Sequence, residues 1–252
     1  MVCTQSLAVF RQNTLFSLIN NTINLDYFID LHNSVKCHNS YNYCGAKILL
    51  VHTNLNIPFL EENLAEYHDF ELINYLKYGF PLGVVPTCII KPTLKNHPSA
   101  HQYFNHIDDF IVKELNYNGI PGPFTFFPFE EPHISPLMTV PKKPTGRRIV
   151  LDASYGDYSL NNAIPESIYL GEPTEYNYPK VEEFEALIIK HGTGALLWKR
   201  DLCRFFLQLP VDPSDYDKLC FVCRGFLFIS VVAMFGLRNS GYAGQRTTSG
   251  VV

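Results

Sequence analysis

Apolar residues recur at helical spacing in two short stretches of the amino-terminal third. Pro58 suits the first position of a helix, and an apolar stripe follows it. Asp69 is placed to cap a second helix, which Gly79 ends. Residues 54–95 are therefore predicted to be helical in part. Residues 1–53 are rich in Asn, show no clean period and remain poorly specified.

Two further helices are predicted downstream. One covers residues 99–116 and stops at Gly119. The other covers residues 179–190, begins at a proline and stops at Gly192. We expect the apolar stripe of this last helix to face the core, and it consists of Val181, Phe184, Leu187 and Ile188.

Several short segments have the pattern of strands. Residues 137–140 and 149–151 are two of them, and residues 195–202 form an apolar strand that contains an Asp near its end. Residues 219–223 and 226–232 flank an Arg-Gly pair and predict a hairpin. Because helices and strands mix without strict alternation, the predicted fold class is α+β.

Composition excludes several classes of protein. The chain has 252 residues, of which 46% are hydrophobic, 17% charged and 14% aromatic. These values exclude a disordered chain, and the length fits one large domain or two small ones. The net charge is −4, which excludes a uniformly basic nucleic-acid coat. Residues 1–140 carry −5 of this charge, however, whereas residues 141–252 carry +1.

Cysteine usage and hydropathy bear on location. Seven irregularly spaced cysteines do not form a disulfide framework. No secretory leader is expected, and the longest nearly apolar run, 226–237, is too short to span a membrane. We therefore expect an intracellular protein with reduced thiols, in the cytoplasm or the nucleus, and without a membrane partner.

Asp201 lies at the end of a predicted apolar strand, where an ionised carboxylate is costly to bury. A carboxylate at a sheet edge can hold Mg²⁺, which takes oxygen ligands. The spacing alone favours the plainer alternative, a helix cap or an ion pair with Arg200 or Arg204.

A basic cluster occupies the turn between two predicted strands. Lys142, Lys143, Arg147 and Arg148 lie within eight residues that contain no acid. Cations that converge at a hairpin tip suit a phosphate ligand, and a solvated charged turn is an equal alternative.

A glycine-containing turn follows the last predicted strand. Phe235 precedes Gly236, which would let a ligand approach the backbone closely. Taken alone, this pattern favours a strand–turn–helix over a binding loop. Elsewhere, a lone CxxC at Cys220 and Cys223 is a weak zinc signal, and the acids of residues 212–217 predict a capped turn.

The order of these features resembles the fingers and the start of the palm of a retroelement reverse transcriptase. The matching stretches are SPLMTVPKK at 135–143, RIVLD at 148–152, LN at 160–161, DLCRFF at 201–206 and FGLRNS at 235–240. Upstream, NHPSA at 96–100 and IPGPF at 120–124 resemble the DIRS group, retrotransposons that encode a tyrosine recombinase. The resemblance covers roughly residues 54–246.

The resemblance implies a right-hand polymerase fold. Its parts would be an amino-terminal extension over residues 1–95, fingers over residues 96–194 and a partial palm over residues 195–252. Implied partners are an RNA or DNA primer–template, deoxynucleoside triphosphates, and the remaining polymerase, RNase H and recombinase parts of the element.

The resemblance also implies residue roles. Asp201 matches the first catalytic Asp, which binds both Mg²⁺ ions, and the Leu202 carbonyl would be a further metal ligand. Phe206 matches the steric gate under the incoming sugar. Arg148, with Lys142 or Lys143, matches the cations that hold the triphosphate.

Phe235 and Gly236 match the loop that packs near the nucleotide and the template. The family's second metal-binding motif, which ends in Asp-Asp, is not found in the 252 residues. We therefore expect little or no polymerase activity from the chain alone, since one carboxylate cannot neutralise two Mg²⁺ ions. The alternative function is a non-catalytic nucleic-acid-binding or interaction protein derived from a decayed retroelement.

Overall fold

A computed structural model of the chain describes residues 53–124, 129, 131–144, 146–169, 171–174, 176, 178–197 and 201–251. Residues 1–52, nearly all of the poorly specified stretch, lie outside the described residues. The elements in chain order are α5 (Ile57–Asn63), α6 (Leu72–Tyr78), α7 (Pro98–Gln102), α8 (Phe104–Asn116), β1 (Leu137–Lys142), β2 (Gly146–Leu151), η2 (Asn161–Ala163), β3 (Ile168–Tyr169), β4 (Glu172–Pro173), α9 (Val181–His191), η3 (Phe206–Gln208), η4 (Pro213–Lys218), β5 (Cys220–Cys223), β6 (Phe226–Ile229) and α10 (Ser240–Val251). None of the described helices is long and apolar enough to cross a membrane.

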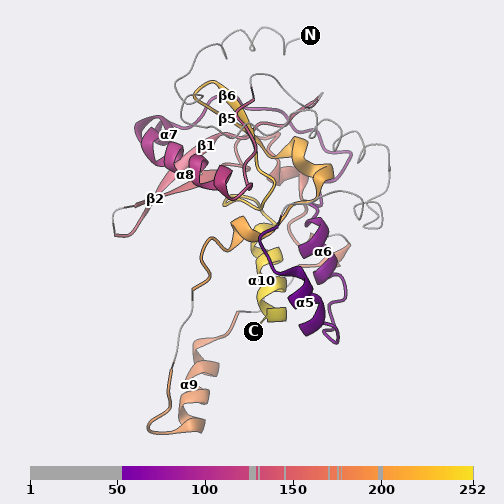
Figure 1. Ribbon diagram of the computed structural model, residues 1–252, viewed down its shortest axis with the longest axis vertical. Coiled ribbons are helices and arrows are strands. Elements are labelled where there is room, and N and C mark those ends of the chain that lie inside the picture. Colours follow the sequence, from indigo (N-terminus) through magenta and orange to yellow (C-terminus); the bar gives the residue numbers. More distant parts are fainter. Residues whose placement is uncertain are drawn as a thin grey trace.

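The described strands form three separate antiparallel pairs, β1–β2, β3–β4 and β5–β6. Together with the helices they confirm the predicted α+β class. The β1–β2 pair runs in register from Leu137 opposite Leu151 to Lys142 opposite Gly146. It confirms both predicted strands, extends each of them, and projects from the body of the molecule as a long hairpin (Figure 1).

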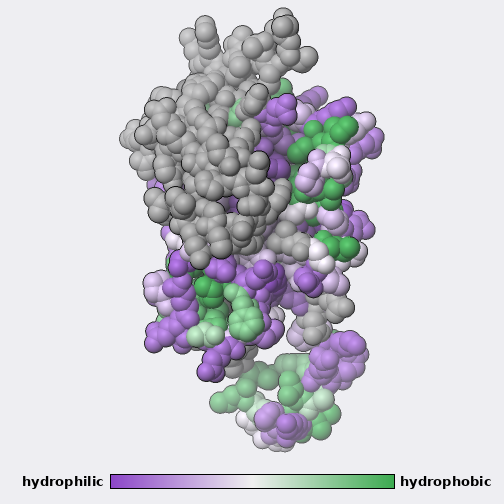
Figure 2. Space-filling view, turned by 90° about the vertical axis from the view of Figure 1, so that its right-hand side faces the viewer, coloured by the Kyte–Doolittle hydropathy of each residue, from purple (hydrophilic) through white to green (hydrophobic). Residues whose placement is uncertain are grey.

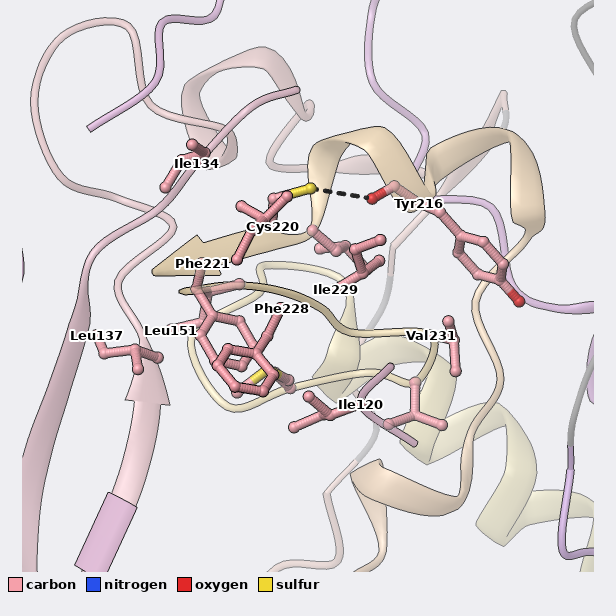
Figure 3. Close-up of a cluster of buried hydrophobic side chains, with 14 of the residues drawn as sticks. Ile120, Ile134, Leu137, Leu151, Tyr216, Cys220, Phe221, Phe228, Ile229 and Val231 are labelled. Atoms are coloured by element: carbon pink, nitrogen blue, oxygen red, sulfur yellow. Dashed lines mark hydrogen bonds between the residues drawn. The ribbon is translucent and has the colours of Figure 1, made fainter. Parts of the chain in front are cut away.

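The larger core lies around the β5–β6 hairpin (Figure 3). The rings of Phe221 and Phe228 stack there with centroids 5.6 Å apart, and Leu137 and Leu151 pack beside them without solvent exposure. All four residues of β6 are buried, which no single-faced alternating strand would allow. The hairpin predicted around the Arg-Gly pair is thereby confirmed.

A second, smaller core joins α5 and α6 to α10, which lie together in Figure 1. Leu72 and Leu76 of α6 are fully buried in it. The prediction that Asp69 caps this helix is wrong, because α6 begins after Glu71 and has no side-chain cap. Asp69 instead binds both nitrogens of the Arg246 fork in α10, at 2.5 and 2.7 Å. Gly79 ends the helix, as predicted.

The long helix predicted over residues 99–116 is divided into α7 and α8. Tyr103 separates them because its backbone leaves the helical region, with φ −121° and ψ 42°. The apolar stripe of α8 is confirmed, since Ile107, Ile111 and Leu115 are buried in the larger core.

Helix α9 forms in the predicted region and stops at Gly192, but it begins at Val181 instead of at the predicted proline, and none of its residues is buried. The prediction that its apolar stripe faces the core is therefore wrong. Phe184 is 50% exposed and Leu187 is 53% exposed. The helix projects from the body at one end of the molecule in Figure 1, and apolar side chains gather on that projection in Figure 2. An amphipathic pattern specifies which face of a helix is apolar, but within the described residues no element covers the apolar face of α9.

Candidate functional site

The β1–β2 hairpin carries the predicted basic cluster. Lys142 and Lys143 are exposed near its tip and form no ion pair with another described side chain. Arg147 instead folds back: its guanidinium donates to the Thr139 carbonyl at 2.8 Å and lies 3.9 Å from the ring centre of Tyr103. Arg148 is exposed and extends from the opposite face of the strand, because successive strand side chains alternate. Three of the four cations thus remain available to a ligand.

Arg148 lies beside Phe235, which in turn contacts Phe206, and the three residues come from distant parts of the chain. Its guanidinium carbon is 4.4 Å from the ring centre of Phe235, within the range of a cation–π contact. The Phe235 ring meets the Phe206 ring edge-on, at 5.2 Å between centroids and 81° between planes. The structure therefore brings into contact three residues that lie in three separate sequence motifs.

Gly236 fixes the loop that carries Phe235. It has a φ of +107°, and a Cβ at this position would lie 1.8 Å from the Leu151 carbonyl oxygen. Only glycine fits so close to β2. The adjoining Leu151 amide donates to the Phe235 carbonyl at 2.9 Å, so the loop is attached to the end of β2. Gly236 itself is exposed, which leaves its outer side open to a ligand.

Asn161 holds the same loop from the other side. Its side-chain amide donates to the Gly236 carbonyl at 2.7 Å, and its side-chain oxygen accepts from the Arg238 amide at 2.9 Å. The residue is 5% exposed, and both bonds go to one turn. Asn161 belongs to the LN stretch at 160–161, for which the sequence predicted no role. Only its position in that motif could have indicated one.

The segment from Asp201 to Phe206 packs against α10 through the rings at its end. Asp201 and Leu202 are exposed, whereas Phe206 is partly buried and begins η3. A Cβ on Gly244 of α10 would lie 2.9 Å from the Phe205 ring and 3.0 Å from the Phe206 ring. The missing side chain of Gly244 therefore gives both rings the room to pack against the helix.

The strand predicted over residues 195–202 is wrong for residues 195–197 and 201–202. These residues are exposed and outside any strand, with Leu196 95% exposed. A strand needs a neighbour to pair its backbone groups and cover its apolar side chains, and the described residues supply none here. Residues 198–200 lie outside the described part of the chain.

The metal ligands implied by the resemblance are only partly supplied. Among the described residues no group of three or more His, Cys, Asp or Glu side chains could hold a metal ion. Asp201 offers one carboxylate and the Leu202 backbone one carbonyl, whereas Mg²⁺ is octahedral and a pair of ions needs several oxygens. The described donor set therefore does not fit two ions by itself.

Two of the remaining sequence signals have structural roles. Cys220 and Cys223 are free thiols, and burial raises the pKa of Cys223 to about 12. The Cys220 thiol donates to the Tyr216 carbonyl at 3.7 Å, as Figure 3 shows. The capped turn predicted over residues 212–217 is confirmed, because the Asp212 carboxylate accepts from the Ser214 amide at 2.9 Å at the start of η4.

Comparison with known proteins gives a structural likeness alone. No family model and no curated protein matches the chain. Among solved structures, a prototype foamy virus protease–reverse transcriptase mutant overlaps 91% of this chain at a TM-score of 0.46 and 16% identity. The native form of that protein overlaps 66% at a TM-score of 0.42 and 20% identity. A foamy viral protease–reverse transcriptase bound to double-stranded DNA overlaps 76% at a TM-score of 0.45 and 14% identity. The chain spans 20%, 27% and 34% of the native, mutant and DNA-bound proteins, respectively.

Proposed function

We propose that this chain is the nucleotide-binding amino-terminal portion of an RNA-directed DNA polymerase of the DIRS-like type. One observation carries the proposal: Arg148, Phe235 and Phe206 form a continuous set of contacts, although they come from three separate sequence motifs. The resemblance implies the same ligand for all three, a deoxynucleoside triphosphate on a primer–template.

The charges of this surface suit such a ligand. Lys142, Lys143 and Arg148 are exposed on one hairpin, and a triphosphate needs several converging cations. The Phe206 ring, held between Phe235 and α10, would lie under the sugar and leave no room for a 2′-hydroxyl. The exposed backbone of Gly236 would face the nucleotide and the template.

Asp201 would be one ligand of the Mg²⁺ ions that such a polymerase uses, with the Leu202 carbonyl as another. Bound Mg²⁺ would supply charge neutralisation for phosphoryl transfer. Because the described residues bring no cluster of acidic ligands together, the further carboxylates must come from elsewhere. We therefore expect the chain alone to bind nucleotide without catalysing synthesis.

Fluorescence anisotropy of a γ-labelled dATP and of a labelled primer–template tests the proposal. The triple variant Lys142→Ala, Lys143→Ala, Arg148→Ala should weaken binding of both. For the primer–template, the slope of log affinity against log salt should fall by about one for each phosphate contact removed. The matched control replaces Lys180 and Lys190, two exposed lysines beside or in α9, with Ala. Equal affinities in the triple variant and the control would contradict the proposal.

A second candidate function is that of a non-catalytic interaction protein. The exposed apolar stripe of α9 favours it, because contiguous exposed apolar surface marks interaction sites. A hollow of about 480 Å³ is lined by Phe184, Leu187, Ile188 and His191 of α9 together with residues 193–197. If nucleotide and primer–template binding are both absent, and changing the stripe to polar residues abolishes self-association, this second function is preferred.

A further inference from the structure

Arg204 has a backbone conformation that its residue type rarely adopts. It lies three residues after Asp201 and two before Phe206, with a φ of +54°. A non-glycine residue in this left-handed region is unfavourable and persists only where the surroundings hold it. The neighbouring residues 201–203 are exposed, and the Gln208 side-chain amide donates to the Cys203 carbonyl at 2.6 Å. The side chain of Arg204 adds an attachment to a separate helix.

Glu114 of α8 binds that side chain. The Arg204 Nε donates to Glu114 Oε1 at 3.1 Å, and one terminal nitrogen donates to Oε2. The Glu114 side chain is 1% exposed and that of Arg204 is 12% exposed, so both charges are withdrawn from water. The guanidinium carbon also lies 3.6 Å from the ring centre of Tyr117, just after α8. Two parallel hydrogen bonds and a stacked ring fix the direction of the guanidinium as well as its distance.

Gly119 makes room for this arrangement. A Cβ at position 119 would lie 3.2 Å from Glu114 Oε2. The carboxylate is thus enclosed by the end of α8, while the arginine that pairs with it comes from 90 residues later in the chain. A buried ion pair is weak evidence for stability, because an apolar pair of similar volume often serves as well, and its best-attested use is to fix a register.

We propose that Arg204, held by Glu114 and Tyr117, is a positioning residue that sets where Asp201 and Phe206 lie relative to the nucleotide. This inference rests on the proposed function for its ligand. The Phe205 and Phe206 rings attach the segment to α10, but Asp201 lies five residues before Phe206. Gln208 holds the Cys203 carbonyl from within the same stretch of chain, whereas the Arg204 side chain, three residues after Asp201, joins the segment to α8.

The chain contains a matched control for this pair. Arg224 also has a positive φ, 49°, and also binds an acid of α8: its Nε donates to Asp108 Oδ1 at 2.9 Å. Its guanidinium carbon lies 4.7 Å from the ring centre of Phe104. Arg224 is, however, at the turn between β5 and β6 and not in the segment 201–206. If attachment to α8 matters in general, removing either pair should therefore have the same effect. If positioning of the segment matters, only removal of the Glu114–Arg204 pair should have an effect.

The test compares two double variants of the full chain. Glu114→Leu with Arg204→Met removes the first pair, and Asp108→Leu with Arg224→Met removes the second, so that neither leaves a charge buried alone. A nitroxide on Cys203, which is exposed and adjacent to Arg204, reports the order of the segment without any ligand. Cys88 and the cysteines at 3, 37 and 44 are changed to Ser, whereas Cys220 and Cys223 are buried and stay.

We expect the first variant to unfold at the urea midpoint of the parent and to show a mobile nitroxide. We also expect it to lose about tenfold or more in affinity for γ-labelled dATP, together with its preference over γ-labelled ATP. The second variant should leave both readouts unchanged. If the first variant does not fold, Arg204→Lys replaces it, because lysine keeps the charge and loses the fork and the stacking.

An unchanged nitroxide spectrum in a folded Arg204 variant would overturn the proposal, as would a mobile nitroxide with an unchanged preference for dATP. If the parent protein binds neither nucleotide, the proposed function fails. The nitroxide comparison then still decides whether Arg204 orders the segment, so the two failures are distinguishable.

Discussion

The guanidinium of Arg148 lies 4.4 Å from the ring centre of Phe235, and this contact joins the β1–β2 hairpin to the glycine-containing turn. Phe235→Leu should keep the apolar packing and remove the cation–π contact. Because such contacts at exposed sites contribute about 0.5–1 kcal/mol, we expect the affinity for γ-labelled dATP to fall by roughly two- to fivefold. Anisotropy measures it, and Phe184→Leu on α9 is the control. An unchanged affinity would mean that the Phe235 ring does not orient Arg148.

Gly236→Ala should destabilise the fold strongly. A Cβ there would meet the Leu151 carbonyl oxygen at 1.8 Å, and neither group belongs to a flexible side chain. We expect a loss of more than about 3 kcal/mol in the free energy of unfolding, measured with urea. Gly156→Ala is the matched control, because φ is also positive, +78°, but nothing lies within 4 Å of the added carbon. The Gly156→Ala variant should lose only about 1–2 kcal/mol in the free energy of unfolding. Equal losses would indicate that the β2 contact relaxes freely.

Asp69 and Arg246 join the amino-terminal helices to α10. Their side chains are 15% and 18% exposed, and the guanidinium carbon also lies 4.7 Å from the ring centre of Tyr75. Asp69→Ala leaves the arginine without its partner, so we expect a loss of about 2–4 kcal/mol in the free energy of unfolding. Glu61→Ala, which breaks the exposed pair with Lys77, should have almost no effect. If the two variants unfold alike, α10 does not depend on this pair.

Two buried groups should give opposite pH dependences. Burial raises the pKa of Asp212 to about 6, so the stability that its protonated form contributes is present below about pH 4 and is lost as pH rises to about 6. Burial lowers the pKa of His133 to about 4, so stability is gained as pH rises from about 4 to about 6.5. Each effect amounts to roughly 3 kcal/mol, and the two largely cancel between pH 4 and 6.

Urea unfolding between pH 4 and 6 separates these contributions. The free energy of unfolding of the parent should hardly change with pH. The His133→Asn variant should lose stability as pH rises, and the Asp212→Asn variant, which keeps the turn cap, should gain stability. The acid that faces His133 is Asp217, and those near Asp212 include Asp215, with Lys218 close to both. Parallel curves in all three proteins would show that neither group titrates differently on folding.

The sequence predicted the local elements better than their partners. Gly192 ends α9 as predicted, and α5 begins at Ile57, one residue before the predicted Pro58, because proline and glycine restrict the backbone within a few residues. The pairing of Glu114 with Arg204 joins residues 90 positions apart, and no periodicity carries that information. The same applies to Asp69, which is suited to a cap by its chemistry but is bound by a more distant arginine.

The candidate site shows the same division. Motif order selected Arg148, Phe206 and Phe235, and these residues are in contact. Asn161 lies in the LN stretch at 160–161, but its role could not be predicted, because only the fold shows that both its polar atoms reach one turn. The strand expected before Asp201 was predicted from apolar residues alone, and apolar residues form a strand only where a neighbouring strand is present.

Helix α9 has a consequence for how this protein can vary. None of its residues is buried, so substitutions there should leave the cooperativity of unfolding unchanged. Its apolar side chains are exposed to other molecules, so substitutions there should change the concentration at which the protein associates. The buried residues of the two cores therefore determine the stability of the fold, whereas the exposed residues of α9 affect solubility. Substitutions in α9 can change solubility without changing stability.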